Sequence, residues 1–310
     1  MNTTPDSPPQ PWDVIVVGGG SAGLSAALMF GRARRRVLVL DGGEPRNAVA
    51  AHMHGVLGHD GRPPLELLAM GHAELGRYDV ERRLARATDV RLEADGVVVV
   101  TADEEFRARR LIVATGLSDE LPSIPGIEQH WGSGVVVCPY CDGWEHRDER
   151  IAVLATSPAS VSYVQLLRQW SSDVVFLLGD VPEPEADDVA ALEARGIAIE
   201  RRGIHRVVAD SDRLTGIELV DGDVLEVDVI FTHTRVTPND ALLRSLGAEV
   251  TEEGWAVVDP SGRTSVPSVW AIGNLVNPSA NVPVSIAAGS MAGAAVNMDL
   301  IAEDIALAIG

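Results

Sequence analysis

The two cysteines of the chain lie three positions apart, at Cys138 and Cys141 in the tetrapeptide Cys-Pro-Tyr-Cys. Two thiols at this spacing can close a small reversible disulfide ring, and the thiolate is the form that attacks another sulfur. Asp142 follows the second cysteine directly, and its carboxyl group can take or give the proton of a thiol. The motif therefore indicates thiol–disulfide redox chemistry at Cys138, Cys141 and Asp142.

Two other interpretations of the cysteine pair are a purely structural disulfide and half of a zinc site completed by His130 or His146. A structural zinc site normally needs four ligands, and the sequence has no second Cys-x-x-Cys motif. A structural bridge is unusual in a reducing cytosol. We expect a redox pair and no metal.

A glycine motif near the start of the chain indicates a nucleotide. Gly18-x-Gly20-x-x-Gly23 follows the β-branched run 13–17 and precedes a predicted helix over 24–34. The glycines let backbone amides approach a pyrophosphate at the start of the helix, and Asp41, at the end of the next predicted strand, can accept a ribose hydroxyl. A structural turn is the alternative, but the flanking elements favour a dinucleotide.

The far end of the chain decides between FAD and NAD at this motif. The segment 264–278, TSVPSVWAIGNLVNP, resembles the second FAD motif of the two-dinucleotide-binding-domain flavoproteins. In that family an acid at the strand end holds the ribityl chain of the flavin, whereas this chain has Gly273 followed by Asn274. An amide can still donate and accept there, so we expect FAD binding to survive.

The elements around these motifs predict an α/β fold with two Rossmann-like domains and a small β-meander. A helix is expected over 65–78, the meander over 80–106, and a second βαβ unit from strands 151–154 and 174–178 with a helix over 159–170. Breaks near Pro122 and Pro238 make the second domain an insertion in the first. We expect a disordered tail over 1–11, an FAD-binding domain over 12–120 and 239–310, and a central domain over 121–238.

The charge of the chain excludes some partners. A formal net charge of -20 over 310 residues disfavours nucleic acid and anionic membrane surfaces. The sequence has no apolar run of 18 residues, and its start lacks the pattern of a signal peptide. With only two cysteines, we expect a cytoplasmic protein with no nucleic-acid and no membrane partner.

The surroundings of the cysteine motif resemble the low-molecular-weight thioredoxin reductase family, from about Trp12 to Leu307. The resemblance implies that Cys141 exchanges electrons with FAD, that Cys138 meets the substrate sulfur, that Asp142 moves protons, and that the protein is a homodimer. His52, His54 and His59 fall in a stretch that the family places beside the flavin. The further expected FAD contacts are Ser21, Ala22, Gly42, Arg46, Asn47, His54, Thr115, Gly116, Val282 and Val284.

The second βαβ unit, where such a reductase binds NADPH, departs from the family. Ala155 and Ser157 replace the two glycines of the turn, and Pro158 removes an amide donor. Asp180 lies where a cluster of arginines would hold the 2′-phosphate, and its charge repels a phosphate. NADPH use is therefore disfavoured.

This combination resembles the thioredoxin-reductase-like dithiol oxidases of the gliotoxin and holomycin type. The resemblance implies that a small-molecule dithiol reduces the cysteine pair, the pair reduces FAD, and O2 reoxidises the flavin to give hydrogen peroxide. Two alternatives stay open. One is a reductase taking electrons from NADPH or ferredoxin, and the other is a flavin-binding protein that sequesters a dithiol.

Overall fold

The computed structural model describes residues 10–310, so the expected disordered tail lies almost entirely outside the described residues. The described chain forms two compact units. The first contains the residues up to Arg46, Leu65–Ser118 and Pro238–Gly310, and the second contains Asn47–Pro64 and Asp119–Thr237. The two strands that carry the chain between the units, β7 (Leu117–Glu120) and β16 (Arg235–Pro238), pair with each other.

The first unit is built on a mixed sheet with the strand order β3-β2-β1-β6-β5-β4, and β17 pairs with the part of β6 that β5 leaves uncovered. Neighbours among β3, β2, β1, β6 and β17 run parallel, whereas β4, β5 and β6 form an antiparallel meander. The strands are β1 (Trp12–Val17), β2 (Val37–Asp41), β3 (Glu81–Leu84), β4 (Asp89–Glu93), β5 (Gly96–Val100), β6 (Glu105–Val113) and β17 (Val269–Ala271).

One part of the expected meander is wrong. The strand β3 lies inside the stretch 80–106, but it pairs in parallel with β2. The helix α2 (Pro64–Leu75), followed by a 3₁₀ turn over Gly76–Tyr78, connects the two strands, and a connection of this length through a helix returns the chain in the same direction. The true meander starts at β4.

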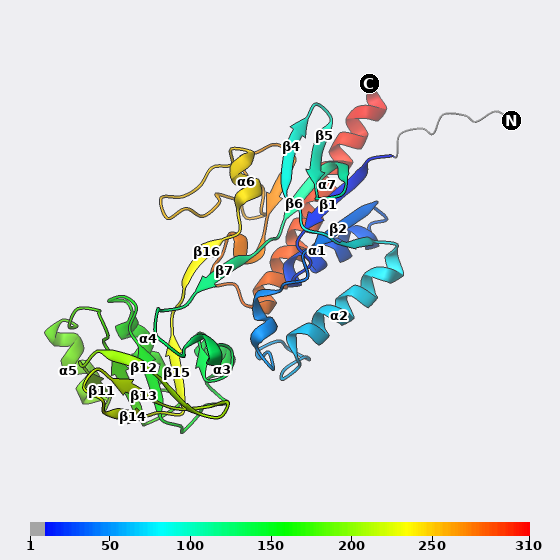
Figure 1. Cartoon of the computed structure of the whole chain (residues 1–310). Helices are drawn as coiled ribbons and strands as arrows, with labels where there is room; N and C mark the ends of the chain where they lie inside the picture. Colours follow the sequence, from blue (N-terminus) through cyan, green and yellow to red (C-terminus); the bar gives the residue numbers. More distant parts are fainter. Residues whose placement is uncertain (1–9) are drawn as a thin grey trace. The chain divides into compact units, whose positions relative to one another are not determined.

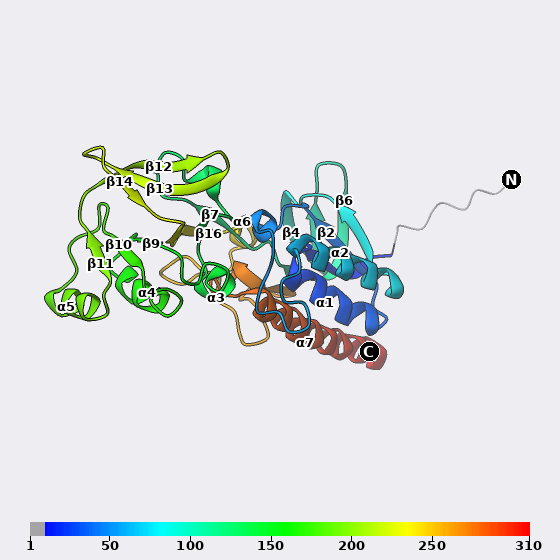
Figure 2. The ribbon, with the colours of Figure 1, turned by 90° about the horizontal axis from the view of Figure 1, so that it is seen from below.

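Two helices far apart in the sequence lie side by side in the first unit. The helix α1 (Ser21–Arg32) runs alongside α7 (Val282–Ile309) in both views (Figures 1 and 2). A side chain at Gly289 would overlap the carbonyl oxygen of Ala22, and one at Gly293 would lie 2.7 Å from Cβ of Met29. The small residues of α7 therefore serve close packing against α1.

The helix α7 has a second, uncovered side. Val284, Met291, Met298 and Ile305 are exposed and recur every seven residues. By length and composition alone, α7 is apolar enough to cross a membrane, with a mean hydropathy of 1.4 in its most apolar window. Core helices meet the same criterion, and α7 packs on α1.

Ion pairs fix the last turns of α7 to the sheet. Arg109 and Arg110 on β6 contact Glu303, and Arg35 before β2 contacts Asp304 at 2.9 Å. Arg110 also contacts Asp299 at 2.6 Å.

The remaining helical elements of the first unit are short. They are the helix α6 (Ala241–Ser245) and the 3₁₀ turns η1 (Arg46–Val49) and η4 (Gly273–Leu275), with η1 at the boundary to the second unit.

The second unit has three layers, which Figure 2 shows edge-on. Its central sheet is parallel, with the order β11-β10-β9-β15-β8, and α4 and α5 cover one face while a second sheet of order β12-β13-β14 covers the other. The elements are η3 (Glu128–His130), β8 (Val135–Val136), α3 (Pro139–Asp142), β9 (Ile151–Leu154), α4 (Ser160–Leu167), β10 (Val174–Leu177), α5 (Ala186–Ala194), β11 (Ala198–Glu200), β12 (Ile204–Asp210), β13 (Arg213–Leu219), β14 (Val224–Glu226) and β15 (Val229–Thr232).

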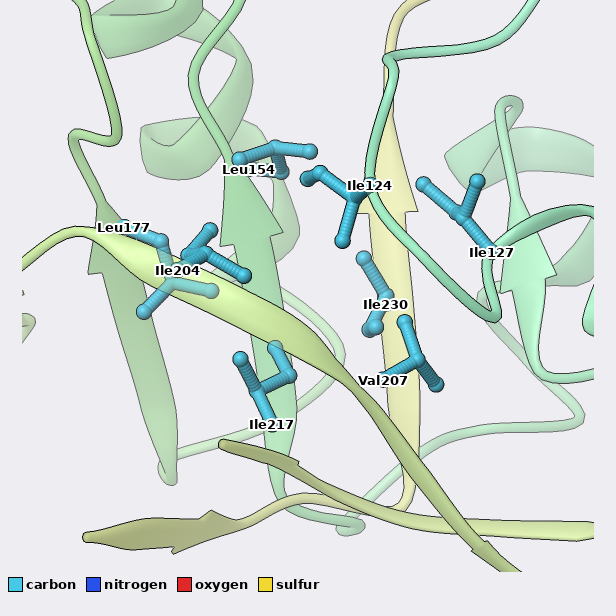
Figure 3. Close-up of a pocket in the computed structure, with 8 residues that line it drawn as sticks. All are labelled: Ile124, Ile127, Leu154, Leu177, Ile204, Val207, Ile217 and Ile230. Atoms are coloured by element: carbon cyan, nitrogen blue, oxygen red, sulfur yellow. The ribbon is translucent and has the colours of Figure 1, made fainter. Parts of the chain in front are cut away.

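A small cavity lies between the two sheets of the second unit. Figure 3 shows aliphatic side chains from both sheets and from the segment before η3 turned toward it, and its volume is only about 10 Å³. Its lining is entirely apolar, from Ile124, Ile127, Leu154, Leu177, Ile204, Val207, Ile217 and Ile230. A void of this size and lining is core packing and offers no ligand site.

The expected fold class is confirmed: the chain is α/β with two Rossmann-like units, each built on a sheet with a parallel core. The boundary of the first domain differs at one place, because residues 47–64 group with the second unit. Gly132 of that unit approaches Val49 so closely that a side chain there would lie 2.7 Å from the Val49 carbonyl oxygen. Contacts of this kind join residues far apart in the sequence, so no local sequence pattern predicts this domain boundary.

Candidate active site

The first glycine motif forms an open cradle at the start of α1. Side chains at Gly18 or Gly23 would overlap the carbonyl oxygens of Ala114 and Gly18, whereas Gly20, the N-cap, faces open space. No side chain caps α1, and its first turn holds no acid. The first amides of α1 are thus available to an anion, and the backbone can approach it closely, as a dinucleotide pyrophosphate requires.

Asp41 supports this cradle from the end of β2. Its Oδ1 accepts the N–H groups of Gly19 at 3.3 Å and Gly43 at 3.0 Å, and Oδ2 lies 3.9 Å from Arg82. A side chain at Gly19 would collide with this carboxylate, so a glycine is needed at this position between Gly18 and Gly20 as well. Sequence reasoning treated Gly19 as a variable position. The expected ribose contact of Asp41 stays a prediction, with Oδ2 as the oxygen that neither amide uses.

Asn274 lies in η4 and holds the following turn. Its Nδ2 donates to the carbonyl oxygens of Asn277 at 3.1 Å and Ala280 at 2.9 Å, and more weakly to that of Pro278. A carboxylate cannot donate and would face three oxygens, so the amide fits this turn better than the acid of the family pattern. Oδ1 is the atom of the side chain that can accept from a ribityl hydroxyl.

A cleft lies beside this turn, and two of the expected FAD contacts, Gly273 and Val284, line it, whereas Asn274 and Val282 do not. Gly273, Asn277, Ala280 and Val284 line it together with the loop 258–262, and its volume is about 160 Å³. Asn281 caps α7 by accepting the N–H of Val284 at 3.2 Å. The start of α7, with Val282 in its first turn, therefore borders a hollow that a ligand can enter.

The other expected FAD contacts fall in both units. Thr115 and Gly116 follow β6, where the Thr115 hydroxyl donates to the Asn239 carbonyl at 2.7 Å. Ser21 and Ala22 form the first turn of α1, Gly42 follows β2, and Arg46 ends the first stretch of the first unit. The first unit thus brings together all the candidates except Asn47 and His54, which belong to the second unit.

The cysteine pair lies in the second unit at the start of α3. Cys138 is the N-cap of this short helix and forms a disulfide with Cys141, with the two Cα atoms 5.1 Å apart. The Cys138 carbonyl accepts the N–H groups of Cys141 and Asp142 at 2.9 and 3.0 Å. Pro139 at the first helical position presets this turn, so the backbone holds both sulfurs within bonding distance. The pairing also occupies the thiolates that a zinc site would need.

Asp142 is an acid with altered proton affinity. The pKa of Asp142 is raised to about 6, chiefly by burial; the charge of Glu145 adds to this rise, and the charges of His146 and His54 oppose it. A carboxyl group that titrates near neutral pH can both accept and return a thiol proton. The geometry therefore supports the proton-transfer role expected for Asp142.

Two aromatic residues beside the pair were missed by sequence reasoning. The Tyr163 hydroxyl on α4 donates to the carbonyl of Val137, the residue before Cys138, and its ring lies 4.1 Å from that of His233. Burial raises the pKa of Tyr163 and lowers the pKa of His233. Both groups thus stay neutral near neutral pH and support the strand leading to the cysteines. They come from separate elements, and no local pattern marks them.

Two backbone amides of the turn after β9 are bound by the side chain of Ser160, the first residue of α4. The fully buried Ser160 accepts, at Oγ, the N–H groups of Thr156 at 3.1 Å and Ser157 at 3.4 Å. These are amides that a glycine-rich turn would offer to a phosphate, and Pro158 has none to offer. Nearby arginines are also engaged, since Arg201 pairs with Glu183 and Arg202 with Glu200.

A nucleotide cradle on one Rossmann-like unit and a redox cysteine pair beside a proton-accepting acid on another define a flavin-dependent disulfide oxidoreductase. The chain belongs to the pyridine nucleotide-disulphide oxidoreductase family, whose model matches residues 12–293. Proteins of this family are FAD-binding flavoproteins, and FAD is the cofactor of this chain.

Named relatives place the chain near the thioredoxin reductases. Thioredoxin reductase sirT of Leptosphaeria maculans is 31% identical over 96% of this chain and 97% of its own length. Thioredoxin reductase tcpT of Claviceps purpurea is 32% identical over 94% of this chain and 95% of its own. The crystal structure of HlmI has a TM-score of 0.92 and 44% identity, covering 96% of this chain and 95% of that one. The resemblance to thioredoxin reductases is confirmed.

Proposed function

We propose that the chain is an FAD-dependent dithiol oxidase, which closes a disulfide in a small-molecule dithiol through Cys138 and Cys141 and reduces O2 to H2O2. The observation that carries this proposal is the turn after β9, where Ser160 occupies the amides that a nicotinamide dinucleotide would need. Without that electron source, a thiol substrate is the reductant that reaches the cysteine pair directly. The resemblance to natural-product dithiol oxidases supports the same direction.

The chain's own residues account for the thiol steps. Asp142 takes the proton of the first substrate thiol, and the thiolate attacks the Cys138 sulfur, which breaks the Cys138–Cys141 bond and releases Cys141 as a thiolate. The second substrate thiol loses its proton and attacks the sulfur now bound to Cys138. The substrate leaves as a disulfide, having lost two electrons and two protons, and the cysteine pair is left reduced.

Bound FAD would supply a two-electron acceptor for the reduced pair and a carrier from which O2, with two protons, is reduced to H2O2. In the first unit, the amides at the start of α1 would bind the pyrophosphate and Asn274 would face the ribityl chain. In the second unit, Asp142 holds and returns the protons that the cysteines exchange.

One anaerobic experiment tests the proposed direction. The purified FAD-loaded protein is mixed with dithiothreitol and, separately, with NADPH, while the flavin absorbance is followed, and air is then admitted. Bleaching by the dithiol, followed by recovery and H2O2 in air, supports the oxidase. A Cys138→Ser variant serves as the matched control and should not bleach with dithiol. If neither reagent bleaches the flavin, a sequestering protein is indicated.

Two relatives are named thioredoxin reductases, which favours a second candidate, a reductase that takes electrons from NADPH or ferredoxin and reduces a protein disulfide. Bleaching by NADPH, or by reduced ferredoxin, without bleaching by dithiol would support it. The blocked turn after β9 argues against the NADPH route.

We also propose a homodimer in the cytoplasm, without nucleic-acid or membrane partners. The exposed apolar residues of α7, spaced by seven, are suited to pair with the same residues of a second copy. Met298→Asp should then convert the dimer to a monomer in light scattering. A wild-type monomer would contradict this assembly.

A further inference from the structure

The loop 53–62 holds a histidine that contacts Glu145, three positions after the acid of the redox site. The loop closes on itself, because Met53 and Arg62 exchange backbone contacts and the Gly61 N–H donates to the Met53 carbonyl, both at 2.9 Å. Asp60 accepts the N–H of Gly55 at 2.8 Å, which fixes its carboxylate within the loop. The loop is therefore a rigid frame for the His54 side chain.

Both ring nitrogens of His54 face carboxylates. Nδ1 lies 3.5 Å from Asp60 and Nε2 lies 3.4 Å from Glu145, which follows the cysteine motif. The His54 side chain is 20% exposed, whereas those of Asp60 and Glu145 are 68% and 39% exposed. One side of the histidine thus adjoins the redox helix, and the other adjoins a carboxylate in contact with water.

Asp142 is a partly buried acid with several titratable neighbours. Asp142 is surrounded by four titratable groups, His54, Glu145, His146 and Tyr163, all close enough to act on it by charge. Each turnover of a dithiol passes two protons through the site, and a single carboxyl group holds one at a time. A second titratable group next to Asp142 lets one proton leave toward solvent while the carboxyl group holds the other.

The other neighbours of Asp142 are poorly suited to this exchange. The Tyr163 hydroxyl donates to the Val137 carbonyl, and burial raises its pKa. His146 is held by Glu149 at 2.7 Å, and its ring packs edge-on against the buried Phe231. Glu145 repels the ionised form of Asp142.

We propose that His54 relays protons between Asp142 and solvent, with Asp60 and Glu145 orienting its ring. His54 then acts through Asp142 as a positioning and relay residue. The direction of proton flow rests on the proposed function, but the coupling of His54 to Asp142 applies to either direction of thiol–disulfide exchange.

The test uses His54→Gln in the FAD-loaded protein, with His54→Asn as a second variant if the first does not fold. Glutamine and asparagine keep a donor near Nε2 or Nδ1 but do not titrate. The control is His205→Gln, the same change at a side chain 60% exposed on β12. Retained FAD absorbance and an unchanged unfolding midpoint confirm the fold of each variant.

The first measurement is the rate of iodoacetamide alkylation of the reduced cysteines against pH, which needs no turnover. Removing the His54 imidazole should move the midpoint to higher pH, because His54 favours the ionised form of Asp142, the base that takes the thiol proton. The second measurement is the rate of dithiol-driven flavin bleaching against pH. The plateau of this rate should fall about tenfold. Added imidazole should restore part of this rate in His54→Gly.

Profiles of His54→Gln that superimpose on those of the wild type, in both measurements, would overturn the relay. A lowered plateau without a shifted midpoint or imidazole rescue would also overturn it, since that indicates a structural role only. If dithiol fails to bleach even the wild-type flavin, the oxidase proposal fails, but the alkylation midpoint still decides the role of His54.

Discussion

The hydroxyl oxygen of Ser160 lies 3.1 Å from the backbone nitrogen of Thr156 and accepts its N–H group. The same oxygen accepts from Ser157, so one buried side chain closes the turn of the second βαβ unit from within. A phosphate would have to displace this serine before reaching the amides.

Removing the Ser160 hydroxyl should therefore destabilise the turn without creating a nucleotide site. Ser160→Ala loses two hydrogen bonds, and we expect the free energy of unfolding to fall by about 1 kcal/mol in urea. NADPH should still fail to bleach the flavin, since Pro158 and Asp180 remain. The exposed Ser133→Ala is the control, and efficient NADPH oxidation by the wild type would contradict the interpretation of this turn.

Asn274→Asp should weaken FAD binding. The introduced carboxylate faces the carbonyl oxygens that Nδ2 now contacts, so the turn before α7 has to rearrange. A loss of about 1–2 kcal/mol corresponds to a rise of roughly five- to thirtyfold in the FAD dissociation constant, measured by equilibrium titration of the apoprotein. The control is Asn297→Asp, where the side-chain oxygen accepts from Arg35 and a carboxylate fits. Equal FAD affinities for the two variants would contradict the role of Asn274.

The rate of dithiol oxidation should follow the ionisation of Asp142. Its carboxylate is the base, and its pKa is raised to about 6, so the rate should rise with pH through this value. Asp142→Asn should lower the plateau by about 100-fold or more and remove this step from the profile. Stopped-flow bleaching across pH measures both, and an unchanged profile in the variant would rule Asp142 out as the base.

The raised pKa of Asp142 also predicts that its ionised carboxylate, which speeds the reaction at high pH, destabilises the fold there. Folding favours the protonated form of Asp142, so this group costs stability above pH 6, and the cost vanishes as the pH falls below its unfolded value of 3.8. Asp142→Asn should be more stable than the wild type at pH 8, by on the order of 1–3 kcal/mol, with the difference disappearing toward pH 4. Urea unfolding at the two pH values checks this.

Cys141→Ser should trap the substrate on Cys138. If the substrate thiolate attacks Cys138, the variant can form a mixed disulfide there but cannot resolve it through its partner sulfur. Intact-protein mass spectrometry should detect the adduct after mild oxidation with the dithiol, and Cys138→Ser should give less of it. Preferential labelling of Cys138→Ser would reverse the roles of the two cysteines.

Much of the first unit could be predicted from local patterns. The run 13–17 is β-branched and apolar, and the glycines after it mark a nucleotide turn, so β1 and α1 lie where expected. The helix begins at Ser21 rather than Leu24, because the last residues of the glycine motif form its first turn. The expected helix 159–170 ends at Leu167, where the chain continues as turns.

The parts that could not be predicted depend on contacts between distant segments. In the sequence, Ser160 is an ordinary residue of a predicted helix. Only the structure shows that its hydroxyl oxygen accepts two N–H groups of the preceding turn. His54 approaches Glu145, some 90 positions later, only because the loop 53–62 closes on itself. In the sequence, Asn274 is only a replacement for the acid of the family motif. The structure explains the replacement, because three carbonyl oxygens accept hydrogen bonds from its Nδ2.

The packing of α7 on α1 has a consequence for synthesis of the chain. The helix that opens the FAD cradle ends at Arg32, yet the surface that Gly289 and Gly293 provide for it is translated about 250 residues later. The segment 119–237 leaves the ribosome well before that surface and can form its own core. The cofactor-binding unit is therefore completed only after α7 has been made, and a premature stop before residue 282 would leave α1 without its partner.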